Sequence, residues 1–437
     1  MNLTPEQKEL GRRNFLKAVA GTPALAALVG AATVTGPKRG GPVKAAIIGS
    51  GGEGKVLLNQ CQKQWIDIRA ICDINPAHAQ GAAEGLEKKG LPKPRTYQDL
   101  KQMLEKEDLE AILIATPLWS HADLAITCME AGKHVLCEKM MAWDVPSCHR
   151  MAETAIKNKR VLEIGYQRFY NPTYQASFDG LIKKGLLGDI YYIRTAWHRN
   201  KDWRRAEKPP SPDFDPKPWG YADWDHLMNW RLFRKHSRGL LAELGSHQLA
   251  ITNWFYEGEP EAVYSSGGVY RFKEGREVPD HVFATFEYSG GRTATFTSIE
   301  SNGFDDNYEQ IMGTKGTLIM SSETEAFYFP EEGAKPTNLA VSKRGGNALV
   351  DASESRSADA AGGRTVPGAP GGGEKFDRLL AYRNEINGFC SAIRTGSPLS
   401  CGPEHAIGSA TACIRAYEAT EQKARLSSST PHGGKPV

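Results

Sequence analysis

The sequence predicts an α/β protein of two domains, the first built on a parallel sheet and the second on a largely antiparallel one. Three observations lead to this prediction. Strand and helix patterns alternate between residues 42 and 165, strand patterns follow one another directly within residues 166–330, and two helical patterns close the chain between residues 376 and 425. With 437 residues, the chain is long enough for two or three domains.

The composition excludes several classes of protein. Hydrophobic residues make up 40% of the chain and charged residues 24%, as in ordinary globular proteins. The net charge is +3 and no basic block is interleaved with aromatic residues, so we predict no nucleic-acid partner. The eight cysteines include no C-x-x-C pair, which argues against a zinc ribbon or a disulfide scaffold, and we predict no metal site.

The first 36 residues form a segment unlike the rest of the chain. Arg12-Arg13, followed by Phe-Leu-Lys, precedes an uncharged run from Ala18 to Gly36 that is rich in Ala, Leu and Val. This order is typical of a secretory signal, and the arginine pair resembles a twin-arginine signal. We therefore expect export to the periplasm and, because the run contains Pro23 and is short for a bilayer span, no stable membrane anchor after processing. The alternative is a disordered tail with an accidental arginine pair.

A glycine-rich turn follows the first strand pattern. The apolar strand Lys44–Ile48 runs into Gly-Ser-Gly-Gly-Glu-Gly, and residues 55–61 continue as a helix. In this context G-x-G-x-x-G is typical of dinucleotide binding: the first glycine makes the tight turn, the second admits the pyrophosphate, and the third lets helix and strand pack closely. The predicted cofactor contacts are Gly49, Ser50, Gly51, Gly52, Glu53 and Gly54.

The next strand indicates which cofactor is bound. It spans Ile68–Cys72 and ends in Asp73, which lies 19 residues after Gly54. A carboxylate at this place accepts the ribose hydroxyls of NAD and repels the 2′-phosphate of NADP, so we predict NAD. The alternative is a glycine turn in an unrelated α/β protein, with Asp73 as a solvated strand end.

Further strands also end in residues that suit the cofactor. The strand patterns 110–115, 133–137 and 161–165 are apolar, as buried parallel strands are. Ligands of such sheets lie at the carboxyl ends of the strands. The additional cofactor contacts that we predict are Thr116, Pro117, Trp119, His121, Glu138, Lys139 and Gln167.

The second domain carries an unusual density of tryptophan. Five of the nine tryptophans are Trp197, Trp203, Trp219, Trp224 and Trp230, and several stand beside charged residues or proline. Aromatic faces next to hydrogen-bonding groups suit a sugar; the alternative is that they fix a long loop to the surface. Residues 331–375 contain no aromatic residue and predict a flexible insertion, and the helices of residues 376–425 are expected to pack on the body.

A carboxylate and an imidazole recur at helical spacing in this domain. A helical pattern that starts near Arg238 places Glu243 and His247 at positions i and i+4, and therefore on one face. There His247 can take the proton of a substrate hydroxyl while Glu243 orients the imidazole or holds a neighbouring hydroxyl. An ordinary surface pair has the same spacing.

Three motifs resemble, in their order and context, those of the Gfo/Idh/MocA oxidoreductases, the relatives of glucose–fructose oxidoreductase and inositol dehydrogenase. They are the glycine motif, the Glu138-Lys139 pair and the E-x-G-x-H run from Glu243 to His247. The resemblance covers about residues 43–319. It implies a Rossmann domain, a C-terminal α/β domain whose open-faced sheet often forms dimers or tetramers, and a nicotinamide between them. It also implies that Lys139 and His247 are catalytic and that Glu243 takes the place of an aspartate. Met140 stands where the family usually has proline.

This resemblance implies NAD-dependent oxidation of a CH–OH group of a sugar, glycoside or polyol. His247 is the expected base, and Lys139 shares or relays the proton. Weaker candidates, for substrate contacts, are Arg168, His198, Arg199 and Trp230. Because NAD is scarce outside the cytoplasm, export implies a tightly held cofactor that is recycled in place. The alternatives are an NAD-dependent glycoside hydrolase or lyase that oxidises a hydroxyl transiently, and a non-catalytic sugar-binding protein.

Overall fold

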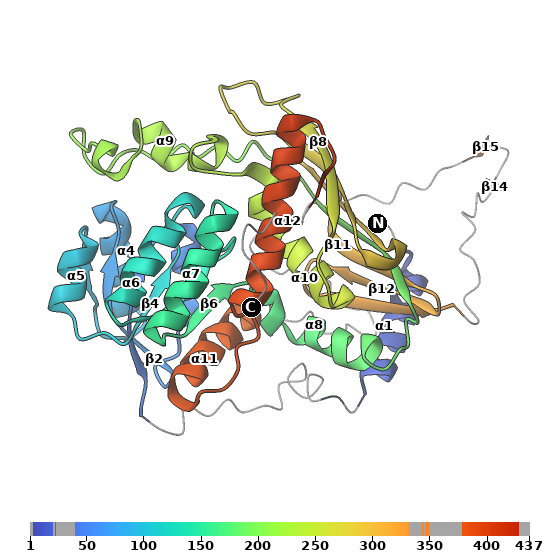
Figure 1. The fold of residues 1–437 in the computed structure, drawn as a ribbon, viewed down its shortest axis with the longest axis horizontal. Helices are drawn as coiled ribbons and strands as arrows, with labels where there is room; N and C mark the ends of the chain where they lie inside the picture. The colour runs from blue at the N-terminus through green and yellow to red at the C-terminus, as the bar shows by residue number, and fades with distance from the viewer. Residues whose placement is uncertain are drawn as a thin grey trace, which may run out of the picture.

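The structure is a computed structural model that describes residues 3–20, 22, 40–331, 343–344, 347–348 and 378–427. Two lobes lie side by side, and helix α12 (Pro403–Gln422) runs between them (Figure 1). The N-terminal lobe is a parallel sheet with helices packed around it, and the second lobe is a larger mixed sheet. The lobes therefore meet along a long boundary, which is where the site lies.

The N-terminal lobe has a six-stranded parallel sheet in the order β3-β2-β1-β4-β5-β6. Its central strands are almost wholly buried, which explains their continuous apolar sequences. The strand order reverses between β1 and β4, so this is the doubly wound arrangement that binds ligands at the carboxyl ends of those two strands. The elements are β1 (Val43–Ile48), α3 (Gly52–Gln60), β2 (Ile66–Cys72), α4 (Pro76–Glu87), β3 (Arg95–Tyr97), α5 (Leu100–Lys106), β4 (Ala111–Ile114), α6 (His121–Glu130), β5 (His134–Glu138), α7 (Val145–Asn158) and β6 (Leu162–Gly165).

The second lobe has an eight-stranded sheet in the order β13-β12-β11-β7-β10-β9-β8-β16. Only the β7–β10 pair is parallel, which confirms the predicted, largely antiparallel sheet. Helix α10 packs on β7 and α12 packs on β8, whereas exposed Tyr264 and Phe283 lie on the other face. The elements are β7 (Ile190–Asn200), α10 (Ser246–Tyr256), β8 (Ala262–Gly268), β9 (His281–Glu287), β10 (Thr293–Ile299), β11 (Ser301–Gly313), β12 (Gly316–Ser321), β13 (Glu325–Pro330) and β16 (Leu426–Ser427).

Helix α1 (Pro5–Val19) packs against the edge strand β13. It begins with a capping box in which the Thr4 hydroxyl accepts from the backbone of Gln7. Phe15 and Val19 are buried, and the Arg12 guanidinium donates to Glu325 at 2.7 Å. Most of the predicted signal's apolar run lies outside the described residues. Within the described part of the chain, no helix has the length and apolar character that a membrane span requires.

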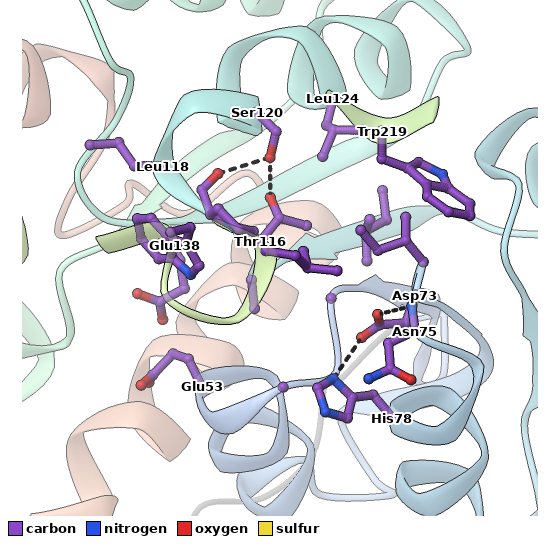
Figure 2. A pocket seen from close by; sticks show the side chains of 18 of the residues that line it. Glu53, Asp73, Asn75, His78, Thr116, Leu118, Ser120, Leu124, Glu138 and Trp219 are labelled. Atoms are coloured by element: carbon purple, nitrogen blue, oxygen red, sulfur yellow. Dashed lines mark hydrogen bonds and ion pairs between the residues drawn. The ribbon is translucent and has the colours of Figure 1, made fainter. Parts of the chain in front are cut away.

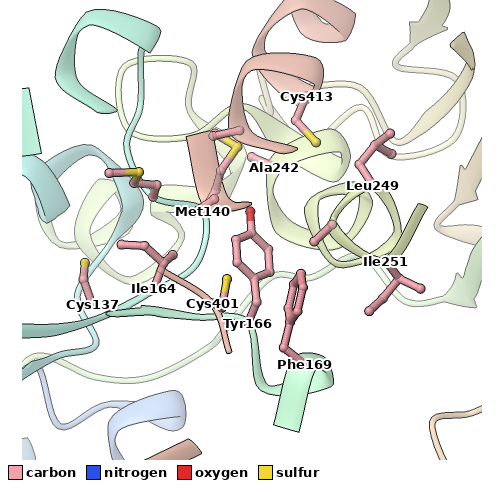
Figure 3. Close-up of a cluster of buried hydrophobic side chains, with 14 of the residues drawn as sticks. Cys137, Met140, Ile164, Tyr166, Phe169, Ala242, Leu249, Ile251, Cys401 and Cys413 are labelled. Carbon is pink, nitrogen blue, oxygen red and sulfur yellow. The ribbon is translucent and has the colours of Figure 1, made fainter. Parts of the chain in front are cut away.

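The two C-terminal helices join the lobes. Helix α11 (Leu379–Thr395) packs on α3, and α12 contacts both α7 and α10. Figure 3 shows the apolar cluster at this junction, where Tyr166 contacts side chains from both lobes and from the C-terminal segment. The helices predicted within residues 376–425 therefore tie the lobes together.

Of the predicted flexible insertion, the structure describes only Glu331 and the paired strands β14 (Lys343–Arg344) and β15 (Asn347–Ala348), so the prediction lies mostly outside the described residues.

All eight cysteines lie in described parts of the chain, none is in a disulfide, and seven are buried. The fold thus relies on packing without cross-links.

Candidate active site

A cavity of about 390 Å³ lies between the two lobes. One wall is made by loops at the carboxyl ends of β1, β2, β4 and β5, and the other by residues 205–243 of the second lobe. Figure 2 shows Asp73, Asn75 and His78 at one end of it and Glu138 at the other. The topology of the parallel sheet therefore forms the site where the glycine motif predicted it.

The glycine loop has the geometry that its sequence predicts. Gly49 has a φ of +85°, and a Cβ on Gly54 would lie 2.1 Å from the Gly49 carbonyl oxygen, so neither position accepts a side chain. A Cβ on Gly51 would meet nothing within 4 Å, and this open space faces the N-terminus of α3. The free N–H groups there suit a pyrophosphate. Gly54 itself shapes the loop and does not line the cavity.

Asp73 is held in place by the same loop. Its Oδ2 accepts from the Ser50 N–H at 2.7 Å and from the Ser50 hydroxyl at 2.9 Å, and its Oδ1 accepts from the Asn75 N–H at 2.8 Å. Asp73 lines the cavity, as a ribose ligand must. Ser50 is fully buried and does not line it, so the predicted cofactor contact of Ser50 is corrected: its side chain braces Asp73.

The loop after β4 supplies the next part of the wall, which includes Thr116, Pro117, Trp119 and His121. The His121 ring lies between the carbonyl oxygens of Thr116 and Met140, each at 2.9 Å, and burial lowers the pKa of His121. The Trp119 indole donates to the Tyr221 hydroxyl at 3.0 Å and so links this wall to the opposite one.

Glu138 and Lys139 lie at the carboxyl end of β5 and also line the cavity. Burial, and then the charge of Glu53, raise the pKa of Glu138 well above its usual range. The Lys139–Met140 peptide bond is cis. The Lys139 ammonium donates to the backbone carbonyl of Glu243 at 3.3 Å, so this amine bridges the two lobes.

Glu243 lines the cavity and His247 does not, although the sequence predicts both on one helix face. Residues Leu241–Gly245 form a π-helical turn before α10, so the stretch from Glu243 to His247 is not a regular α-helix. Glu243 lines the cavity and its Oε2 accepts from Arg231 Nε at 2.8 Å. The carboxylate is therefore engaged by a guanidinium that the sequence did not indicate.

His247 lies behind the cavity wall. Its ring packs against Tyr166 and Trp197, with centroid distances of 6.1 and 5.8 Å, and only 6% of the residue is exposed. Burial, and then the charge of Lys139, lower the pKa of His247 well below its usual range. The imidazole is thus neutral, and its burial and the charge of Lys139 oppose its protonation.

Four other predicted residues lie outside the cavity. Gln167 and Arg168 are both buried. The Arg168 guanidinium donates to Glu309 at 2.6 Å and to Glu323 at 2.7 Å. Arg168 therefore forms an internal ion pair, which corrects its predicted substrate contact. The remaining two are on β7 beyond the cavity: the His198 ring contacts the Phe304 carbonyl and the Thr297 hydroxyl, and Arg199 stacks on Trp203. Of the four predicted substrate residues, only Trp230 lines the cavity.

Sequence reasoning missed several residues of the opposite wall. Arg231 directly follows the predicted Trp230, and Arg205 follows Trp203-Arg204, so adjacency to tryptophan was the available signal. The others are Tyr221, Leu227 and Met228. They occur in a segment without periodicity, which is why no pattern indicated their direction. Together, the open N-terminus of α3, the carboxylate of Asp73 and the apolar wall fit a dinucleotide.

Comparison with known families identifies the protein class. Residues 43–166 match the oxidoreductase family with an NAD-binding Rossmann fold, and residues 180–427 match the C-terminal alpha/beta domain of the same family. The chain belongs to the Gfo/Idh/MocA oxidoreductase family. The predictions of the fold, of an oxidoreductase and of NAD as cofactor are therefore confirmed.

Relatives of this Gfo/Idh/MocA protein have several activities. An inositol 2-dehydrogenase from Rubrobacter xylanophilus is 25% identical over 63% of this chain and 70% of that protein. A 2,7-anhydro-N-acetylneuraminate hydratase from Mediterraneibacter gnavus is 25% identical over 62% of this chain and 66% of that one. A glycosyl hydrolase family 109 protein from Shewanella pealeana is 28% identical over 46% and 44%, so the chain matches less than half of that relative.

A solved structure shares the fold. Levoglucosan dehydrogenase, solved in complex with NADH and L-sorbose, superposes with a TM-score of 0.66 at 18% identity. The superposition covers 89% of this chain and 99% of that one. At this identity the likeness concerns the arrangement of the two lobes.

Proposed function

We propose that this oxidoreductase acts on a CH–OH group of a sugar, glycoside or polyol, with NAD that stays bound between turnovers. The observation that carries the proposal is the position of Lys139, whose ammonium lies in the same cavity as the glycine loop and reaches Glu243 of the other lobe. The similarity to an inositol 2-dehydrogenase supports a polyhydroxylated substrate.

The side chains around Lys139 suit proton removal from an alcohol. Alcohol oxidation needs an acceptor for the hydroxyl proton while hydride leaves the same carbon. NAD, when bound, supplies the hydride acceptor. Lys139 contacts the hydroxyl and relays its proton toward His247, whose lowered pKa favours onward release of that proton. The Arg231–Glu243 pair fixes the carbonyl that positions the ammonium.

Substitution of the two groups tests this assignment. Lys139→Ala and His247→Ala each lower kcat by about 10²- to 10⁴-fold, the usual contribution of a positioned acid or base. Lys157→Ala, an exposed lysine on α7, is the matched control. Sugars, glycosides and polyols are supplied to the purified protein, and the change in NADH absorbance is followed. Unchanged rates in both variants would instead favour a non-catalytic sugar-binding protein.

The alternative is a glycoside hydrolase or lyase that oxidises a hydroxyl only transiently. The similarity to a glycosyl hydrolase family 109 protein and to a hydratase favours it. In this cycle the hydride removed in the first step returns to the sugar in the last, so no NADH accumulates. Release of free aglycone without net NADH supports the alternative, whereas a stoichiometric keto product supports the oxidoreductase.

We also propose that the chain is exported by the twin-arginine route and works in the periplasm. The Arg12-Arg13 pair before an uncharged run supports this. Cell fractionation tests it: Arg12→Lys combined with Arg13→Lys should retain the protein in the cytoplasm.

We further propose that the protein forms a homo-oligomer, a dimer or tetramer. Exposed Tyr264 and Phe283 on the uncovered face of the sheet support this proposal. Light scattering, which measures the mass of the particle in solution, tests it.

A further inference from the structure

A long segment of the second lobe crosses to the N-terminal lobe. We name residues 201–238 the strap; it contains helix α9 (Trp224–Met228) and the short turns Lys217–Trp219 and Trp230–Leu232. Figure 1 shows α9 over the N-terminal lobe and away from the second sheet. The cavity side chains that the strap supplies are Arg205, Trp219, Tyr221, Leu227, Met228, Trp230 and Arg231.

Arg205 extends from the strap to the glycine loop. Its Nη2 lies 3.6 Å from the position that a Cβ on Gly52 would occupy, which is the first residue of α3. Among the described residues, no carboxylate forms an ion pair with the Arg205 side chain, which is exposed to the open cavity. A guanidinium beside the N-terminus of a helix is suited to clamp a phosphate, since both groups offer N–H donors to an anion.

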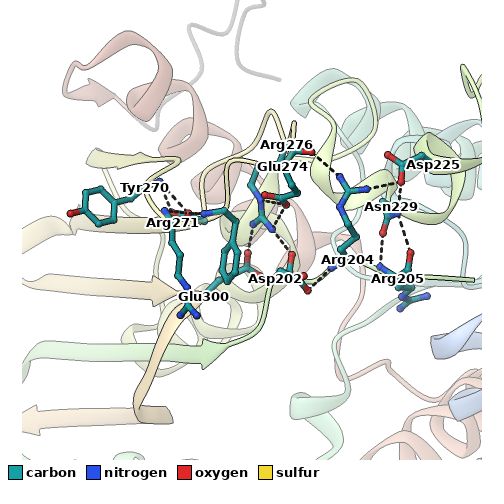
Figure 4. A network of polar contacts seen from close by, with 12 residues as sticks. Asp202, Arg204, Arg205, Asp225, Asn229, Tyr270, Arg271, Glu274, Arg276 and Glu300 are labelled. Carbon is teal, nitrogen blue, oxygen red and sulfur yellow. Dashed lines mark hydrogen bonds and ion pairs between the residues drawn. The ribbon is translucent and has the colours of Figure 1, made fainter.

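The backbone of Arg205 is fixed by a buried asparagine. The Arg205 N–H donates to Asn229 Oδ1 at 2.7 Å, and Asn229 Nδ2 donates to Asp225 at 2.7 Å (Figure 4). The preceding Arg204 turns the other way and pairs with Asp225 at 2.6 Å. Of these two adjacent arginines, one therefore stabilises the strap while the other is aimed at the cofactor site.

Arg205 and the N-terminus of α3 offer positive charge to one part of the cavity. Arg205 and Arg231 both line this part of the cavity. Arg231 is paired with Glu243 at 2.8 Å, whereas Arg205 has no ion pair among the described residues and is available to an anion at the N-terminus of α3. The pyrophosphate of NAD is the anion that this fold brings to the N-terminus of α3.

The first residues of the strap are attached to both lobes. On the N-terminal lobe, Glu207 contacts His78 at 2.6 Å, and His78 lies 3.9 Å from Asp73. On the second lobe, the buried Arg276 donates to the Asp202 carbonyl and to Glu300 (Figure 4). Arg205 therefore lies between a contact to each lobe, at Asp202 and at Glu207.

We propose that Arg205 pairs with the pyrophosphate of NAD and that the Glu207–His78 contact latches the strap over the cofactor. The strap thereby retains NAD through purification and turnover, an inference that rests on the proposed function because that function requires retained NAD. The strap supplies a reason for retention that the glycine loop alone does not, since it covers the bound dinucleotide from the other lobe.

The test is the NAD content of the purified full chain. NAD is released by denaturation and quantified by chromatography, and its loss from the native protein is followed during dilution. We expect nearly one NAD per wild-type chain, dissociation about 10- to 100-fold faster in Arg205→Ala, and a smaller acceleration in Glu207→Gln. Lys208→Ala, an exposed cation of the same strap outside the cavity, should match the wild type.

Two outcomes separate this inference from the proposed function. If wild type and Arg205→Ala hold NAD equally long, the Arg205 contact is overturned although retention stands. If the wild type carries no NAD, the proposed retention is wrong, and titration with added NAD then tests the Arg205 contact. Equal dissociation constants for wild type and Arg205→Ala overturn that contact. A larger dissociation constant for Arg205→Ala supports it. Thermal unfolding without NAD confirms that the variants fold.

Discussion

Replacing Arg168 by methionine tests the corrected role of that residue. Arg168 is 1% exposed and donates to Glu309 at 2.6 Å and to Glu323 at 2.7 Å. Removing one partner of a buried ion pair typically costs about 3–5 kcal/mol, because the remaining charge stays buried. Glu323 keeps Arg378 at 2.9 Å and Glu309 keeps the Tyr174 hydroxyl at 2.9 Å, so we expect a loss near the lower limit, about 3 kcal/mol.

The assay is urea unfolding followed by tryptophan fluorescence at pH 6 and pH 8. Without the guanidinium, the folded-state pKa of the buried carboxyls rises above the unfolded value, so the folded variant holds protons that the unfolded chain releases. The loss of stability should therefore be smaller at pH 6 than at pH 8. Arg425→Met, which breaks an exposed pair with Glu287, should leave stability almost unchanged. Wild-type stability with a raised KM in Arg168→Met would refute this reasoning and restore Arg168 as a substrate contact.

Three more predictions concern the N-terminal lobe. Gly51→Ala should fold normally yet bind NAD at least about tenfold more weakly. Gly54→Ala, whose Cβ would lie 2.1 Å from a carbonyl oxygen, should lose about 1–3 kcal/mol of stability. Equal effects of the two substitutions on NAD affinity and on stability would contradict the assigned roles. Asp73→Asn should raise the affinity for NADP relative to NAD by about tenfold or more in a fluorescence titration, and an unchanged ratio would place the ribose elsewhere. Burial raises the pKa of Glu163 from 4.5 to about 8, so between these values the folded chain keeps a proton that the unfolded chain loses. Stability therefore falls as pH rises from about 5 to 8, by up to about 1.4 kcal/mol per pH unit. Glu163→Gln should lack this fall in stability. If the unfolding free energies of wild type and Glu163→Gln change in parallel with pH, the assignment to Glu163 is wrong.

The parts of the fold that could be predicted are those encoded over short stretches of sequence. The apolar strands, the glycine turn and Asp73 each depend on neighbours within one strand–turn–helix unit, and the topology of a parallel sheet then brings their ends together. Lys139 was predictable for the same reason, since it follows a buried strand directly. Asp73, Lys139 and, from the glycine turn, Gly49, Gly51, Gly52 and Glu53 line the cavity as expected.

The remaining site residues depend on contacts between distant parts of the chain. Arg168 meets Glu323 across 155 positions of sequence, and no local pattern distinguishes such an internal pair from a substrate contact. Glu243 lies in a π-helical turn, which a helical spacing rule does not anticipate. Arg205 belongs to an irregular segment whose direction is fixed by Asn229, 24 positions later.

The unpaired cysteines have a consequence for the lifetime of the protein if, as proposed, it works in the periplasm. Burial raises the pKa of most of these thiols, Cys72 and Cys148 to about 12, so the native molecule resists oxidants. An unfolded molecule in an oxidising compartment exposes eight thiols at once and forms random cross-links that block refolding. Each unfolding event is then a permanent loss, so the height of the unfolding barrier sets how long the molecule survives.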